Sequence, residues 1–159
     1  MTSATTHACA VLVGARAVLI RGPAGAGKSR LAYKLIEAGR TGLLPFARLV
    51  ADDRVHLESV NGRLLVRPAE KLAGLLEVRG LGILRFAYEP CAVVGLVVDL
   101  AAPDAERMPP SEARQTVLAG IALPRLPVAP GNAVLPSLLA VLTSAEDITA
   151  WPFGAVPGR

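Results

Sequence analysis

The sequence predicts an α/β domain in which a central mixed sheet, flanked by helices, carries a phosphate-binding loop. Residues 22–29 read Gly-Pro-Ala-Gly-Ala-Gly-Lys-Ser and match the pattern G-x-x-x-x-G-K-[ST] at every fixed position. Residues 17–20 precede this loop as a short apolar strand, and residues 30–38 follow it with apolar residues spaced like one face of a helix. Hydrophobic residues make up 52% of the chain and aromatic residues only 4%, so Leu, Val, Ile and Ala must build the core, as in buried parallel sheets.

Length and charge narrow the function classes. At 159 residues the chain is long enough for one domain with a hydrophobic core. We expect this P-loop domain over residues 1–142 and a loosely held tail over residues 143–159, which are polar and rich in Pro and Gly. The 17 Lys and Arg against 13 Asp and Glu give a net charge of +4. The basic residues form no block and aromatic residues are few, which argues against a nucleic-acid partner.

The chain carries no signal that would direct it out of the cytoplasm. Residues 1–7 lack the basic stretch of a secretory signal. The longest apolar run, residues 91–98, is too short to span a membrane. Cys9 and Cys91 lie in apolar runs without metal-ligand spacing, which is typical of reduced thiols in a cytosolic protein. We therefore expect a cytoplasmic protein with no membrane partner.

The segments on either side of the loop predict a hairpin, a helix and a surface loop. We expect a strand at residues 7–13, a tight turn at Gly14, and a second strand at residues 16–20 that completes the hairpin. The helix after the loop should end at Gly39, which favours the left-handed conformation of a C-terminal cap. Residues 41–48 contain Gly and Pro and read as an excursion over the surface.

More strands follow this excursion. Residues 49–51 form a short strand that ends at the pair Asp52-Asp53. Residues 55–58 and 63–66 flank Asn61-Gly62, which is a strong hairpin signal.

The second half of the chain mixes strands with two helical segments. Residues 69–76 should form a helical turn or two, and residues 91–100 are the most hydrophobic strand, which we place at the centre of the sheet. Residues 111–119 read as a helix capped by its first serine. A proline-rich extended stretch at residues 125–132 then leads into the apolar segment 133–142.

The glycine-rich loop predicts binding of a nucleotide triphosphate. Its backbone N–H groups and the N-terminus of the following helix would hold the phosphates. Lys28 should reach the β- and γ-phosphates, and the Ser29 hydroxyl should hold Mg²⁺. The predicted nucleotide-binding residues are Gly22, Pro23, Ala24, Gly25, Ala26, Gly27, Lys28 and Ser29. A GTPase is disfavoured because the chain contains no Asn-Lys-x-Asp sequence for reading guanine.

Phosphoryl transfer also needs an acidic residue near the metal and a group that takes the proton of the acceptor. Asp99 ends the apolar run 93–98, which fits the ordinary Walker-B pattern. Asp52 and Asp53 end a shorter strand but offer two carboxylates side by side. Neighbouring residues of a strand point to opposite faces, so both reach one site only if the chain turns there. Spacing alone does not decide between the two acidic sites.

Several short segments carry a resemblance to a known family. They are His7, the phosphate-binding loop fifteen residues later, Leu49-Val50-Ala51-Asp52-Asp53-Arg54-Val55, Leu76-Glu77-Val78-Arg79-Gly80-Leu81-Gly82-Ile83, and Pro127-Val128-Ala129-Pro130-Gly131-Asn132. In this order and spacing they resemble the catalytic domain of HPr kinase/phosphorylase, in the short form that lacks the N-terminal domain of longer members. The likeness runs from about residue 7 to residue 132 and so covers most of the chain.

This resemblance implies a P-loop kinase domain that transfers phosphate from ATP to a serine of HPr, the small phosphocarrier of the sugar phosphotransferase system. It implies that Asp52 is the base that takes the proton from the acceptor serine. His7 would lie near the transferred phosphate, and Lys28 would bind that phosphate. Longer members of the family form hexamers, so the resemblance also suggests a homo-oligomer.

The resemblance also assigns the metal-binding side chains. Ser29 and Glu77 would hold Mg²⁺, with Asp53 close to the metal. Arg79 belongs to the same signature as Glu77 and would brace that carboxylate or a phosphate. Under this interpretation Asp99 takes a structural position.

Four departures from the family pattern argue against phosphorylase activity. Pro23 stands at the second loop position, where many members have an acid. The excursion at residues 41–48 lengthens the connection before Asp52. Asn132 directly follows Gly131, so the late signature lacks its arginine, and no second arginine-bearing loop is evident.

Two other functions agree with the same loop. A small-molecule kinase would need a lid whose arginines clasp the donor. No arginine pair in a helical lid pattern is evident, although Arg107 and Arg114 could be argued. A nucleotide-binding regulatory module without catalysis would agree with Pro23 and the missing late arginine.

Overall fold

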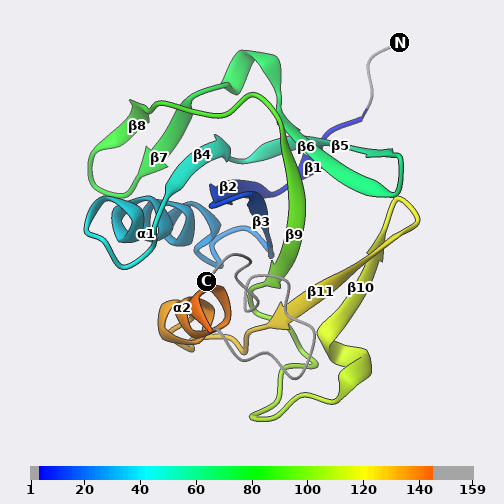
Figure 1. The fold of residues 1–159 in the computed structure, drawn as a ribbon. Helices are drawn as coiled ribbons and strands as arrows, with labels where there is room; N and C mark the ends of the chain where they lie inside the picture. The colour runs from blue at the N-terminus through cyan, green and yellow to red at the C-terminus, as the bar shows by residue number, and fades with distance from the viewer. Residues whose placement is uncertain (1–3, 145–159) are drawn as a thin grey trace.

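The computed structural model describes residues 4–144 (Figure 1). Its elements are β1 (Thr6–His7), β2 (Cys9–Val13), β3 (Arg16–Arg21), α1 (Lys28–Arg40), β4 (Ala47–Ala51), β5 (Arg54–Val60), β6 (Arg63–Pro68), β7 (Leu75–Val78), β8 (Gly82–Arg85), β9 (Ala92–Asp99), β10 (Gln115–Leu118), β11 (Ile121–Pro127) and α2 (Leu135–Thr143), with 3₁₀ turns at Glu70–Leu72 and Ser111–Arg114. One nine-stranded sheet follows the order β1-β5-β6-β9-β3-β2-β4, with β11 added to β9 and β10 added to β11. Strands β7 and β8 form a separate two-stranded sheet. The predicted α/β fold with a central mixed sheet is confirmed.

Strand β9 lies at the centre of the sheet, as predicted. It pairs in parallel with β3 on one edge, while its other edge pairs antiparallel with β6 at the start and in parallel with β11 at the end. Most of its residues are buried, which explains its unbroken apolar sequence. Because β3 and β9 run in parallel, their last residues, Arg21 and Asp99, meet at the sheet edge where the phosphate-binding loop begins.

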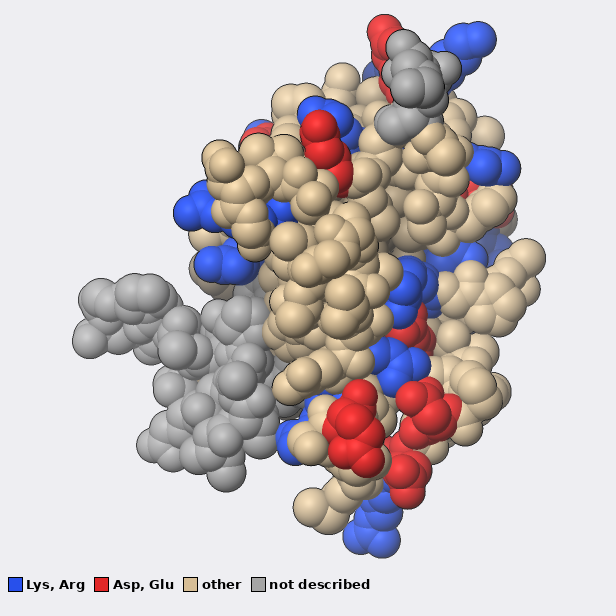
Figure 2. Space-filling model, turned by 90° about the vertical axis from the view of Figure 1, so that its right-hand side faces the viewer, with Lys and Arg blue, Asp and Glu red and all other residues tan. Residues whose placement is uncertain are grey.

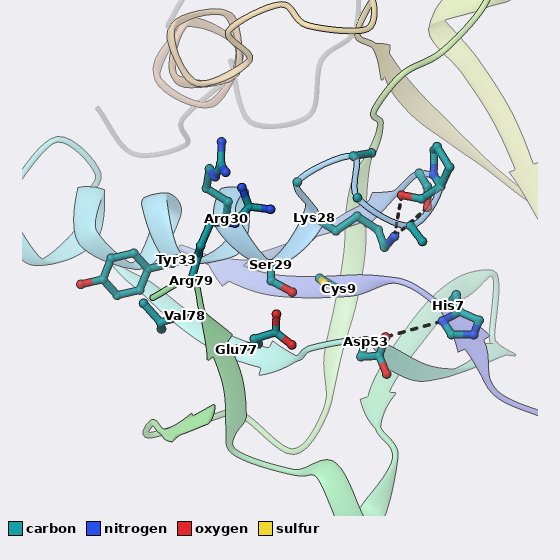
Figure 3. Close-up of a pocket in the computed structure, with 16 residues that line it drawn as sticks. His7, Cys9, Lys28, Ser29, Arg30, Tyr33, Asp53, Glu77, Val78 and Arg79 are labelled. Atoms are coloured by element: carbon teal, nitrogen blue, oxygen red, sulfur yellow. Dashed lines mark hydrogen bonds and ion pairs between the residues drawn. The ribbon is translucent and has the colours of Figure 1, made fainter. Parts of the chain in front are cut away.

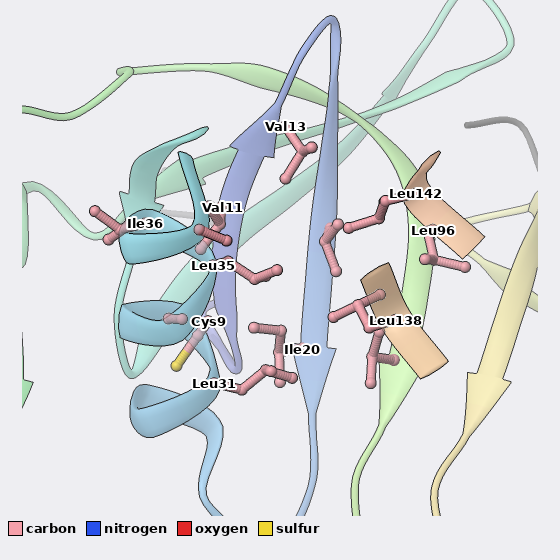
Figure 4. Close-up of a cluster of buried hydrophobic side chains, with 14 of the residues drawn as sticks. Cys9, Val11, Val13, Ile20, Leu31, Leu35, Ile36, Leu96, Leu138 and Leu142 are labelled. Atoms are coloured by element: carbon pink, nitrogen blue, oxygen red, sulfur yellow. The ribbon is translucent and has the colours of Figure 1, made fainter. Parts of the chain in front are cut away.

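Both helices pack on one face of the sheet and share a core with it (Figure 4). In α1 the buried residues Leu31, Ala32, Leu35, Ile36 and Ala38 form one stripe, as the helical period requires. Leu138 and Leu142 of α2 join the same cluster. A second cluster on the opposite face is built almost entirely from strand residues, including Ala10, Leu19, Val55, Leu64 and Val97. The sheet therefore curls and packs against itself on that side.

The predicted hairpins are present. Strands β2 and β3 pair antiparallel around a turn at Gly14, which has a φ of 62°. Strands β5 and β6 pair around Asn61 and Gly62, whose φ values of 51° and 77° are those of the predicted tight turn. At the other end of the chain, Thr143 ends α2, and the remainder of the predicted tail, residues 145–159, lies outside the described residues.

The prediction that α1 ends at Gly39 is wrong. The helix continues to Arg40, and Gly42, with a φ of 86°, is the residue that takes the left-handed conformation. Gly39 has another purpose, because a Cβ added there would lie 2.8 Å from the Cβ of Ala47. The glycine therefore allows α1 to pack directly against the first residue of β4.

The prediction of a helix over residues 111–119 is also wrong. Only Ser111–Arg114 form a 3₁₀ turn, and residues 115–118 form β10, which pairs with β11. Ala119 and Gly120, with φ values of 50° and 79°, form the two-residue turn of this hairpin. Pairing with β11 therefore overrides the local helical signal. Likewise, residues 69–76 contain one 3₁₀ turn and the start of β7 rather than a longer helical segment.

The close packing at Gly39 gives a stability prediction. Helix propensity alone would make Gly39→Ala stabilising by about 1 kcal/mol. The clash with Ala47 reverses that sign, and we expect a net loss of about 1 to 2 kcal/mol in the free energy of unfolding, measured in urea. Lys34→Ala, at an exposed position of the same helix, is the control and should change stability by less than about 0.5 kcal/mol. A more stable Gly39→Ala protein would contradict the close contact between α1 and β4.

Candidate functional site

The phosphate-binding loop joins β3 to α1 and forms one wall of a cleft of about 1020 Å³ (Figure 3). All eight predicted nucleotide-binding residues line this cleft, together with His7, Cys9, Arg30, Tyr33, Asp53, Glu77, Val78 and Arg79. Gly22 lies so close to Leu100 that a Cβ added there would be 3.0 Å from the Cβ of Leu100. The loop therefore starts where only glycine fits.

Lys28 lies folded over the loop that precedes it. Its Nζ donates hydrogen bonds to the carbonyl oxygens of Gly22, at 2.7 Å, and Pro23, at 3.2 Å (Figure 3). The ammonium group is thus held over the hollow of the loop, next to the N-terminus of α1. Free N–H groups of the first helical turn and the helix dipole favour an anion at this point. The arrangement is suited to holding phosphate groups.

Asp52 is the one charged side chain that is buried among the described residues, with 7% exposed. Its Oδ1 accepts hydrogen bonds from Ser29 Oγ, at 2.6 Å, and from Cys9 Sγ, at 2.8 Å. Its Oδ2 accepts one from the backbone N–H of Glu77, at 3.1 Å. Burial raises the pKa of the Cys9 thiol and the neighbouring carboxylate raises it further, so this thiol stays a neutral donor at physiological pH. Asp52 therefore fixes the loop serine and the strand that carries Glu77.

Asp53 points into the open part of the cleft because the chain turns sharply at this residue. Its φ is 74°, and the N–H of Arg54 donates to the carbonyl oxygen of Asp52 at 2.9 Å, which together define a γ-turn. The turn meets the condition under which both neighbouring carboxylates reach one site. The side chain of Asp53 is 63% exposed, and its Oδ1 lies 3.6 Å from Nδ1 of His7 (Figure 3).

Glu77 and Arg79 come from β7 and the turn that follows it. Figure 3 shows the Glu77 carboxylate facing the Ser29 hydroxyl across the cleft, and Arg79 reaching toward the N-terminus of α1. The structure therefore brings His7, Lys28, Ser29, Asp53, Glu77 and Arg79 to one cleft. Asp52 is not among the residues that line it, but is buried and hydrogen-bonded to Ser29.

The oxygen atoms in this cleft are of the type that Mg²⁺ prefers. The Ser29 hydroxyl and the Glu77 carboxylate are hard donors with the Asp53 carboxylate nearby, and Mg²⁺ is commonly held by one or two such side chains together with substrate phosphates and water. The residues present thus fit a magnesium ion that is shared with a bound nucleotide.

Four cleft residues were not predicted from the sequence, namely Cys9, Arg30, Tyr33 and Val78. Two of them had a local signal. Arg30 directly follows the loop motif, and Tyr33 lies one helical turn beyond Ser29. Cys9 had none, because its partner Asp52 is 43 residues away in the chain.

Asp99, the competing acidic candidate, lies outside the residues that line the cleft. Its carboxylate accepts hydrogen bonds from Nε and Nη2 of Arg21, both at 2.7 Å, and from Nε of Arg125, at 2.5 Å. Arg125 also binds Asp104. The β10–β11 hairpin, to which Arg125 belongs, lies on the side of the molecule seen in Figure 2, where acidic and basic side chains are interspersed. Asp99 therefore connects the last residue of β3 to β11.

The ion pairs of Asp99 predict a pH-dependent stability. Burial opposes ionisation of this carboxyl, but hydrogen bonds and charge from Arg21 and Arg125 outweigh it and hold the pKa below its ordinary value. A carboxyl with a lowered pKa stabilises the fold above its ordinary pKa and loses that contribution as pH falls through the folded-state value. We expect Asp99→Asn to reduce the free energy of unfolding by about 1 to 3 kcal/mol at pH 7.

Urea unfolding at pH 7 and at about pH 3 measures this effect. The difference between the wild-type protein and Asp99→Asn should shrink at the acidic pH. Asp104→Asn, which removes the exposed partner of the same arginine, should have a much smaller effect. An equal loss at both pH values would mean that the charge of Asp99 does not stabilise the fold.

The fold and the cleft define a P-loop domain of the kinase type, and comparisons with known proteins identify the family. The family model described as HPr Serine kinase C-terminal domain matches residues 1–137. The chain belongs to this family, and the predicted resemblance is confirmed. Among the described residues, no helix is long and apolar enough to cross a membrane.

Individual relatives agree with this family. The chain is 37% identical over 140 residues to HPr kinase/phosphorylase of Geobacillus thermodenitrificans. The aligned region covers 79% of this chain and 43% of that protein. It is 41% identical over 78 residues to the protein of the same name from Clostridium beijerinckii, covering 49% of this chain and 24% of that one. The chain thus spans less than half the length of these curated relatives.

A solved structure shares the fold. The HPr(Ser) kinase/phosphatase of Coxiella burnetii superposes with a TM-score of 0.68 and 27% sequence identity, over 86% of this chain and 91% of that one.

Proposed function

We propose that this chain is a magnesium-dependent kinase that transfers the γ-phosphate of ATP to a serine of an HPr-like phosphocarrier protein. The observation that carries this proposal is the single cleft in which the intact loop, with Lys28 and Ser29, faces the exposed pair Asp53 and His7. Phosphoryl transfer, unlike binding alone, needs a group that takes the proton of the acceptor, and an accessible acid opposite the loop supplies one. Family membership supports the kinase class, and the relatives, which are HPr kinase/phosphorylases, support the acceptor.

In this proposal the chain's residues divide the work of binding and transfer. The loop N–H groups and Lys28 hold the phosphates and neutralise charge that develops on the transferred group. Ser29 and Glu77 hold Mg²⁺, which supplies charge stabilisation for the phosphates when it is bound. The serine oxygen of the acceptor forms a bond to the γ-phosphorus, the bond from that phosphorus to the bridging oxygen breaks, and ADP leaves. Arg79 supports Glu77 or a phosphate from the far side of the cleft.

The proton of the acceptor serine needs an accessible base. The resemblance gives this role to Asp52, but all its hydrogen bonds already serve Ser29, Cys9 and the backbone of Glu77. Asp53 has a free carboxylate in the open cleft, with His7 beside it. We therefore assign proton acceptance to Asp53, orientation of Asp53 to His7, and positioning of Ser29 to Asp52. A general base must be within hydrogen-bond reach of the proton it takes, which favours the exposed carboxylate.

The kinase assignment predicts labelling of the phosphocarrier. Purified protein with Mg²⁺ and γ-labelled ATP should phosphorylate HPr on serine, and a metal chelator should abolish the reaction. Lys28→Ala should reduce the rate by at least about a hundredfold, whereas Lys34→Ala, exposed on the same helix, should leave it unchanged. Inorganic phosphate added to phosphorylated HPr should yield little unphosphorylated HPr and little pyrophosphate, because the late arginine of the family is missing.

Tight ATP binding without labelling of HPr would contradict the kinase assignment and indicate a non-catalytic regulatory module. Labelling of a small metabolite in place of HPr would indicate a small-molecule kinase.

The two neighbouring acids give a second, sharper prediction. Asp53→Asn should lower kcat by about 10²- to 10⁴-fold with little change in ATP affinity, because it removes only the proton acceptor. Asp52→Asn should weaken Mg·ATP binding as well as the rate, because it disturbs Ser29. Asp104→Asn, an exposed acid outside the cleft, serves as the control. Abolished transfer with unchanged ATP affinity in Asp52→Asn, together with an active Asp53→Asn, would return the role of base to Asp52.

A further inference from the structure

The β7–β8 hairpin exposes large apolar side chains beside the nucleotide cleft. All four residues of β8 are exposed, and the hairpin forms a sheet of its own, apart from the main sheet. Leu81, in its turn, is 72% exposed, and Ile83 is 67% exposed. Large apolar side chains that gather on an exposed surface often mark an interaction site.

The strand register places part of this apolar surface next to the cleft. Residue Glu77 of β7 pairs directly with Ile83 of β8, and Leu75 pairs with Arg85. Directly opposed residues in an antiparallel pair have their side chains on the same face. Ile83 therefore lies on the face that carries Glu77, whose carboxylate lines the cleft. We call this surface, made by Leu81, Ile83 and Arg85, the hairpin face.

The hairpin is anchored firmly to the site. The N–H of Glu77 donates to the Asp52 carboxylate at 3.1 Å. At the hairpin's other end, the N–H of Phe86 donates to the carbonyl oxygen of Gly74 at 2.7 Å, and the Phe86 ring packs edge-on against Tyr33 of α1. A molecule seated on the hairpin face is consequently held at a fixed position relative to the cleft.

The charges around the hairpin face indicate what fits it. Arg79 and Arg85 are both exposed, and within residues 4–144 neither has an ion-pair or hydrogen-bond partner. By contrast, Arg48 and Arg67, on neighbouring parts of the fold, are paired with Glu89 and Glu58. Arg79 lines the cleft, so Arg85 is the unpaired cation of the hairpin face. Together with the exposed Leu81 and Ile83 it matches a partner surface that combines apolar side chains with carboxylates.

We propose that the hairpin face is the docking surface for the acceptor protein, which presents an apolar patch flanked by carboxylates next to its serine. This inference rests on the proposed function, because a protein whose serine enters the cleft must lie against the wall that continues from Glu77. A second copy of the chain fits less well. Each copy carries a net charge of +4, and a symmetric contact would bring the unpaired arginines of both copies together.

The test uses a matched pair of exposed apolar positions. Ile83→Ser and Leu81→Ser should each raise the KM for the acceptor about tenfold, with kcat changed less than about twofold. ATP affinity should stay the same, since neither side chain lines the cleft. Val117→Ser is the control, because Val117 is 65% exposed on β10, in the other hairpin, and should leave acceptor KM unchanged. Arg85→Glu should also raise acceptor KM and weaken its dependence on salt.

Direct binding of the acceptor, measured by titration without ATP, separates this inference from the kinase assignment. Wild-type protein that binds the acceptor through Ile83 but does not phosphorylate it would overturn the proposed function and support the docking surface. Unchanged acceptor binding in both Ile83→Ser and Leu81→Ser would overturn the docking surface, whatever the activity. Loss of self-association in these variants, seen by sedimentation with unchanged acceptor KM, would assign the face to a second copy and would also overturn the inference.

Discussion

The Asp52 carboxylate joins three segments that are far apart in the chain and that together form the cleft. Its hydrogen bonds reach β2 through Cys9, the start of α1 through Ser29, and β7 through the backbone of Glu77. A buried carboxylate is costly by several kcal/mol unless its oxygens are satisfied. The three donors offset this cost only when all three segments are in place. The loop, the first strands and the β7–β8 hairpin therefore keep a common geometry, and displacement of any one leaves a buried charge without its partners.

The γ-turn at Asp53 gives two adjacent carboxylates different environments. Without the turn, the side chain after Asp52 would point to the opposite face of the strand. The left-handed φ of 74° is sparsely populated for residues other than glycine, although Asp tolerates it better than most, and such conformations persist where the surrounding structure holds them. Here the hydrogen bonds made by the neighbouring Asp52 carboxylate hold Asp53 in this conformation. One acid can then organise the loop while the other remains accessible, which is a common way to divide roles between paired acids.

Local signals predicted much of the fold and most of the cleft. The loop motif, Gly14 and the pair Asn61-Gly62 each specify a backbone conformation within a few residues, so they can be read without tertiary information. The predictions for Gly39 and for residues 111–119 were wrong for the opposite reason. Contacts with Ala47 and with β11 decide the structure there. The same limit applies to the site. The sequence predicts that Asp52 and Asp53 matter, but their different burial depends on partners 23 to 43 residues away in the chain.

The position of Asp99 explains why the paired acids beside the loop, Asp52 and Asp53, follow β4 rather than β9. Strand β9 is a direct neighbour of β3, so an acid at its end would be the ordinary choice beside a phosphate-binding loop. In this fold, the Asp99 carboxylate forms ion pairs with Arg21 and Arg125. These ion pairs fix Arg21, which immediately precedes Gly22. Asp52 and Asp53 instead follow β4, which lies beyond β2 on the other side of β3. The loop is therefore held on its β9 side by ion pairs and approached on its β4 side by Asp52, Asp53 and the β7–β8 hairpin. In the proposed function, phosphoryl transfer and acceptor docking both use that second side, while the ion pairs of Asp99 on the first side stabilise the fold.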